Sequence, residues 1–98
     1  MKKILLDFRN METTEQVHDH LSRQFDFPDY YGRNLDALHD LLTEQTEDTC
    51  IGVFTPEEPE EKRDIDRYLH KIKFVMRDAE EENPHLCVIF GSVEDNYE

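Results

Sequence analysis

The chain has little glycine, little positive charge and no tryptophan, with 3 glycines and 11 lysine or arginine residues among 98. Phosphate-binding loops are rich in glycine, and the sequence contains no such loop. The few basic residues argue against binding to nucleic acid or to anionic membranes. No apolar run reaches the length of a membrane-spanning helix, and Asp7 interrupts the signal-like start "MKKILLDF". We therefore expect a cytoplasmic protein.

Cysteine is also rare, and neither Cys50 nor Cys87 belongs to a C-x-x-C or metal-binding pattern. Both lie in apolar runs that we interpret as strands, so we predict buried free thiols rather than a disulfide. The histidines form no metal motif, and we expect no cofactor. Each histidine is predicted to be at the surface or half-buried: His18, His20, His39, His70 and His85.

Acidic residues, in contrast, are abundant: 24 against 11 basic residues, for a net charge of -13. The apolar residues, 37% of the chain, are gathered into periodic segments, which predicts one folded domain over residues 1–98. So large a charge favours rapid capture of a cationic partner. It is equally explained by solubility alone.

Three short apolar runs, at 2–8, 49–54 and 86–90, alternate with helical patterns. The long crossovers permit parallel pairing, so we predict an α/β fold with a small parallel sheet. The last two runs are continuously apolar, which predicts strands covered on both faces. Residues 55–64, "TPEEPEEKRD", are interpreted as a loop or a short helical start.

Apolar residues also recur at helical spacing. Thr13 and Gln16 form a potential capping box before a helix whose buried face is marked by Val17, Leu21 and Phe25. A later helix is marked by Ile65, Tyr68, Leu69, Ile72, Met76 and Ala79, and Asn83 with Pro84 ends it. Its last turns carry Asp78 and three glutamates, where the helix dipole prefers cations. These acids either face solvent or await a cation from outside.

The helix that follows Asn34, a good N-cap residue, has two contrasting faces. Its leucines have core spacing, and the opposite face carries an acidic stripe with His39 beside it: Asp36, Asp40 and Glu44. Like charges one turn apart repel. Tyr30 and Tyr31 precede the helix, and tyrosine is common at interfaces. The stripe is either a solvated face or a surface for a basic partner.

The segment "DYYGRNLDALHDLL" resembles the signature of the barstar family, inhibitors of small bacterial ribonucleases. The resemblance implies a three-stranded parallel sheet packed with about four helices. It also implies that the loop with Tyr30 and Tyr31 and the helix that follows Asn34 enter the basic active site of a ribonuclease, where acids replace RNA phosphates. The implied partner-binding residues are Tyr30, Tyr31, Gly32, Asn34, Asp36, Asp40 and Asp78, with Asp40 the central carboxylate.

The sequence departs from the barstar pattern at the edge of this surface. His39 stands where that pattern has tryptophan, Glu44 and Gln45 where it has glycine and tryptophan, and Asp78 where it has glutamate. We include His39 and Glu44 among the expected contact residues. The departures imply a different ribonuclease partner rather than a different mode of inhibition.

Our main hypothesis is therefore an intracellular inhibitor, an immunity protein or antitoxin, that blocks a basic ribonuclease or ribonuclease toxin. We expect a monomer when free, no catalytic residue, and no binding to nucleic acid or membranes. An acidic adaptor for a basic protein that is not a nuclease is the second hypothesis. A small hydrolase that uses paired carboxylates is the third.

Overall fold

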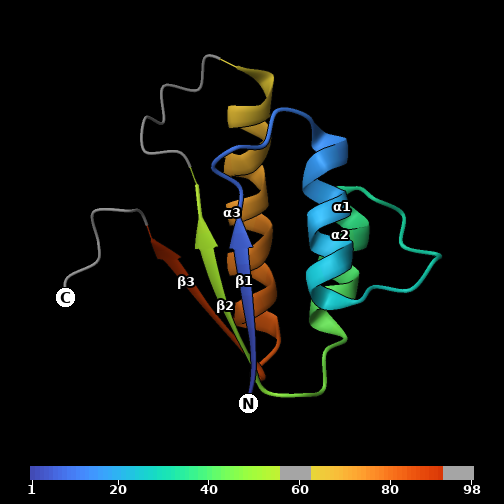
Figure 1. Cartoon of the computed structure of the whole chain (residues 1–98). Coiled ribbons are helices and arrows are strands. Elements are labelled where there is room, and N and C mark those ends of the chain that lie inside the picture. Colours follow the sequence, from blue (N-terminus) through green and yellow to red (C-terminus); the bar gives the residue numbers. More distant parts are fainter. Residues whose placement is uncertain (56–62, 92–98) are drawn as a thin grey trace.

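The computed structural model describes residues 1–55 and 63–91 and confirms an α/β fold (Figure 1). Its elements are β1 (Lys2–Asp7), α1 (Thr14–Phe25), α2 (Leu35–Thr43), β2 (Thr49–Phe54), α3 (Asp64–Glu82) and β3 (Leu86–Gly91). The three strands are parallel, in the order β1-β2-β3. The described residues contain three helices, and the fourth expected helix is not found among them. Most of the predicted 55–64 loop lies outside the described residues.

One face of the sheet forms the core. Ile4, Ile51 and Val88 share one row of the register, and all three are buried. The next row on the opposite face holds Leu5 and Ile89, which are 57% and 55% exposed. The prediction that the last two strands are covered on both faces is therefore wrong for the described part of the chain. Their apolar runs arise because the uncovered face is apolar too.

Helix α1 is defined by its cap and its apolar face, as predicted. The Thr13 side chain accepts from the backbone N–H of Gln16, and the Gln16 side chain accepts from the backbone N–H of Thr13, which completes a capping box. Val17, Leu21 and Phe25 are all buried. Burial of one such side chain contributes about 1.5–3 kcal/mol, so this face attaches α1 to the core.

Helix α3 packs against both α2 and β3, and Figure 1 shows it running along the sheet. Its predicted apolar positions are buried except Tyr68, which is half-buried and packs on the core. The helix ends at Asn83, as predicted, and Asn83 donates its backbone N–H to the carbonyl of Ala79. No helix in the described ranges has the length and apolarity needed to cross a membrane.

Candidate protein-binding site

The acidic stripe of α2 faces solvent because the opposite face of the helix is packed. Asn34 begins the helix, as predicted, with its side-chain oxygen 2.7 Å from the backbone nitrogen of Ala37. The buried face consists of Leu38, Leu41 and Leu42. Four residues are exposed where the sequence placed the binding acids: Asp36, Asp40, Glu44 and, on α3, Asp78.

These exposed carboxylates have no counter-ion among the residues that the structure describes. Within residues 1–55 and 63–91, no ion pair involves Asp36, Asp40, Glu44 or Asp78. The arginines that form ion pairs do so with acids elsewhere, on β1, α1 and α3: Arg9, Arg33, Arg63, Arg67 and Arg77. Mutual repulsion along α2 is therefore not relieved by any ion pair in the described part of the chain, and a cation from outside would relieve it.

The two adjacent tyrosines of the tyrosine loop (residues 26–34) have opposite environments. The Tyr30 side chain is 80% exposed, whereas Tyr31 is only 7% exposed. The Tyr31 ring packs against Phe27, with ring centroids 4.7 Å apart, and its hydroxyl oxygen lies 2.6 Å from Nδ1 of His18. Tyr30 can therefore reach a partner directly. Tyr31, for which a partner contact is also predicted, is buried and holds the loop against α1.

His18 is the centre of this attachment. It is buried, and its Nε2 atom lies 2.7 Å from the hydroxyl of Tyr68 on α3. Burial, followed by the charge of Arg33, lowers the pKa of His18. The expectation that every histidine is exposed or half-buried is therefore wrong for His18. It lies one helical turn before Leu21, on the buried face of α1, and that spacing was an available signal.

The second half of the tyrosine loop is held by Arg33 and constrained at Gly32. Arg33 has a positive φ of 58° and forms an ion pair with Asp19 of α1. It also donates to the backbone carbonyl of Glu15 at 3.3 Å. A Cβ atom at Gly32 would lie 3.2 Å from the Cβ of Ala37, so glycine lets the loop approach α2 closely. The acidic stripe and Tyr30 are thus presented on an anchored segment.

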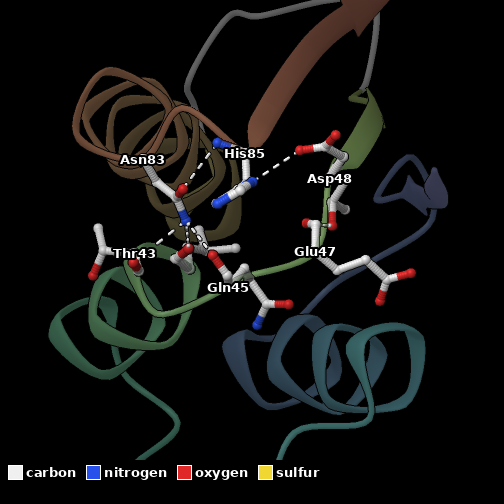
Figure 2. Close-up of polar contacts among 8 residues, drawn as sticks. Thr43, Gln45, Glu47, Asp48, Asn83 and His85 are labelled. Atoms are coloured by element: carbon white, nitrogen blue, oxygen red, sulfur yellow. Dashed lines mark hydrogen bonds and ion pairs between the residues drawn. The ribbon is translucent and has the colours of Figure 1, made fainter.

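The other end of α2 is fixed by the side chain of Asn83, which was predicted only to end α3 (Figure 2). Its amide nitrogen lies 3.0 Å from the carbonyl oxygen of Leu42, 3.3 Å from that of Thr43 and 2.9 Å from that of Gln45. Helix C-termini leave carbonyls without partners, and Asn83 supplies the missing donor. No spacing rule in the sequence indicates this contact, since the partners are about 40 residues apart.

Asn83 also orders the start of β3, because its Oδ1 accepts from the backbone nitrogen of His85 at 2.9 Å. The His85 ring in turn lies 2.8 Å from a carboxylate oxygen of Asp48, the residue just before β2 (Figure 2). The segment between α3 and β3, which holds Asn83 and His85, therefore connects α2, α3 and two strands. It sets the position of the acidic stripe relative to the sheet.

His39 joins the stripe to the end of α3. Its Nε2 atom lies 3.6 Å from a carboxylate oxygen of Glu82, and its side chain is 29% exposed. The structure thus brings the α2 acids near Glu82, a residue that sequence analysis placed only in an acidic run. The resulting surface extends from the tyrosine loop over α2 to the last turn of α3.

The acidic stripe does not line the cavity that the structure shows beside helix α1. That cavity has a volume of about 290 Å³ and lies between the end of β1 and helix α1; its lining residues are Asn10, Met11, Gln16, Asp19, His20 and Arg23. Among residues 1–55 and 63–91, no group of three or more histidine, cysteine or acidic side chains could hold a metal ion. The exposed carboxylates of α2 suit docking to a cationic surface better than acid–base chemistry in a pocket.

Comparison with known proteins identifies the family of this chain. A model of the family described as "Barstar (barnase inhibitor)" matches residues 1–91. A curated relative from Bacillus subtilis (strain 168), named "Putative ribonuclease inhibitor YrdF", is 60% identical over 43 residues. That match spans 44% of this chain and 47% of the relative, about half the length of each. Because the family model extends from the first residue through β3, this chain belongs to the barstar family.

Proposed function

We propose that this protein inhibits a small basic ribonuclease by covering its active site with the tyrosine loop and α2. The observation that carries the proposal is the exposure of Asp36, Asp40 and Glu44 without internal counter-ions in the described chain. Membership of the barstar family and the name of the curated relative support it.

Each element of the surface has a chemical task in this proposal. Asp40, at the middle of the stripe, accepts charge-assisted hydrogen bonds from arginine or protonated histidine in the phosphate site of the enzyme. Asp36 and Glu44 lie one turn to either side of it and extend the row of negative charge. Tyr30 packs its ring on an active-site side chain. Asp78 contributes a further carboxylate from α3.

Backbone geometry sets how closely the surface can approach. Gly32 keeps the tyrosine loop close to α2, and Asn34 fixes the first turn of the helix. His39 is positioned by Glu82 and lies at the rim, where a different ribonuclease would meet a different set of residues. Tyr31 acts within the protein, as a support for the loop.

The net charge of -13 adds a long-range electrostatic attraction, which draws a basic enzyme toward the protein before contact. We extend the proposal to an immunity or antitoxin role inside the cell that makes the ribonuclease. In that role the protein acts as a monomer, occludes the active site of the enzyme and catalyses nothing itself.

A capture experiment from the native organism tests the proposal. Wild-type, Asp40→Lys and Glu12→Lys proteins serve as baits, and captured proteins are assayed for RNA cleavage after release. Glu12 is an exposed acid in the connection between β1 and α1, so its variant matches the charge change away from α2. We expect wild type and Glu12→Lys to retain a basic ribonuclease and Asp40→Lys to lose it. Retention of a basic protein without nuclease activity would favour an adaptor instead.

A further inference from the structure

The two cysteines form an adjacent pair on the uncovered face of the sheet. Cys50 on β2 and Cys87 on β3 are register partners, and neither forms a disulfide in the structure. Cys50 is half-buried and Cys87 is exposed, so the prediction of buried thiols is wrong while the prediction of free thiols is confirmed. The same row begins with Lys3 on β1.

The backbone holds this pair at a separation that a disulfide can span. Neighbouring strands lie about 4.8 Å apart, and disulfide-linked residues have Cα atoms about 4.4–6.8 Å apart. Register partners in a parallel sheet project their side chains to the same face. The neighbouring Cys50 thiol raises the pKa of Cys87.

The strand ends that carry the cysteines are also anchored. The backbone nitrogen of Thr49, next to Cys50, donates to the carbonyl of His85 at 2.8 Å. The nitrogen of Leu86, next to Cys87, donates to the carbonyl of Asn83 at 3.1 Å. The two thiols are therefore kept side by side, and reaction between them does not require the sheet to open.

We propose that Cys50 and Cys87 form a redox-modifiable dithiol site, which hydrogen peroxide converts to an intramolecular disulfide. The Cys87 thiolate attacks one peroxide oxygen, becomes a sulfenic acid and releases water after a proton is taken up. The Cys50 thiolate then attacks the sulfenic sulfur, so that the S–S bond forms as the S–O bond breaks. The departing hydroxide takes up the proton released by the Cys50 thiol and becomes a second water. Two thiols lose two hydrogen atoms in total, and one hydrogen peroxide is reduced to two waters.

This site is independent of the proposed inhibitory function, since it lies on the sheet and not on α2. Because the exposed Cys87 reacts with Cys50 in the same molecule, it does not form a disulfide with a second molecule. Glu80 also raises the pKa of Cys87 and Arg77 lowers it, with a net rise, so the thiolate is scarce at neutral pH. The reaction is therefore expected to be slow at pH 7 and faster at mildly alkaline pH.

The test is to treat the reduced protein with hydrogen peroxide at mildly alkaline pH and to follow its intact mass. We expect a product lighter by about 2 Da, monomeric, with a Cys50–Cys87 cross-linked peptide that a thiol reductant separates. Cys50→Ser and Cys87→Ser proteins, checked for folding by circular dichroism, should not give this product. They should instead accumulate sulfenic or sulfinic acid or disulfide-linked dimers.

Three results would overturn the proposal. The first is a wild-type protein that mainly forms intermolecular dimers, and the second is one that oxidises each cysteine separately. The third is wild-type thiols that stay reduced under conditions that oxidise the unfolded, urea-denatured chain. The denatured chain is the matched control, because it has the same two cysteines without the register that places them together.

Discussion

The hydroxyl oxygen of Tyr31 lies 2.6 Å from Nδ1 of His18, and this contact joins the tyrosine loop to α1. Through its other nitrogen His18 reaches Tyr68, so one imidazole connects the loop to two helices. A neutral imidazole has one donor and one acceptor nitrogen, so one tyrosine hydroxyl donates to the ring and the other accepts from it. The loop that presents Tyr30 is thereby fixed from the inside.

Removing this hydroxyl should destabilise the protein. Tyr31→Phe keeps the ring but leaves Nδ1 of His18 buried without its partner. We expect the free energy of unfolding to fall by about 1–3 kcal/mol, measured by urea denaturation. Tyr30→Phe is the matched control, and because Tyr30 is exposed its effect should stay within about 0.5 kcal/mol. Equal effects of the two substitutions would show that the Tyr31–His18 contact does not stabilise the fold.

The buried imidazole also predicts how stability depends on pH. Burial lowers the pKa of His18, and it does the same for His20, so the folded state binds fewer protons than the unfolded state below about pH 6.5. The stability that comes from keeping these two histidines neutral is therefore fully present above that pH. It is lost as the pH falls toward their pKa in the folded state. The slope should be at most about 1.4 kcal/mol per pH unit for each group.

Denaturant unfolding between pH 7.5 and 5.5 measures this slope. His18→Gln should flatten the dependence, because it removes the buried imidazole whose pKa is lowered in the folded state. A slope unchanged in His18→Gln would mean that other groups control stability in this range.

Asn83 provides a third prediction, because its amide is the donor for three carbonyl oxygens at the end of α2. Asn83→Ala should lower the free energy of unfolding by about 2 kcal/mol or more, since buried carbonyls lose their partner. Amide hydrogen exchange should accelerate at Glu44 and Gln45, whose backbone nitrogens bond within this last turn. Asn10→Ala, at an exposed position, is the control. Unchanged exchange at the end of α2 would contradict the assigned role of Asn83.

Electrostatic attraction predicts the kinetics of association with the ribonuclease. Because the protein carries a net charge of -13, the association rate constant should fall tenfold or more between about 20 and 500 mM salt. The dissociation rate constant should change much less, since contacts in the complex are short-ranged. Stopped-flow fluorescence separates the two constants. An association rate that does not respond to salt would exclude electrostatic steering.

Local patterns in the sequence were sufficient to predict the elements and the acidic stripe. The Thr13 and Asn34 caps, the apolar face of α1 and the end of α3 at Asn83 all follow from spacing along the chain, and all are confirmed. The exposure of Asp36 and Asp40 follows from the leucine face opposite them. These features depend on neighbours within one or two helical turns.

Features that depend on distant neighbours could not be predicted in this way. Continuous apolar strands suggested burial on both faces, but the number of layers is set by where the helices pack, so Leu5 and Ile89 remain exposed. Adjacent tyrosines gave no indication of which one faces inward, because the partner of Tyr31 lies 13 residues earlier on α1. The pairing of Cys50 with Cys87 likewise depends on strand register, which local sequence does not determine.

The central claim is that the carboxylates of α2 occupy the phosphate site of a ribonuclease. The most direct measurement is the inhibition constant of the captured ribonuclease with Asp40→Asn, which keeps the shape of the side chain and removes its charge. We predict a rise of about thirtyfold or more, corresponding to about 2 kcal/mol, and less than threefold for the control Glu12→Gln. Equal inhibition constants for wild type and Asp40→Asn would contradict the claim.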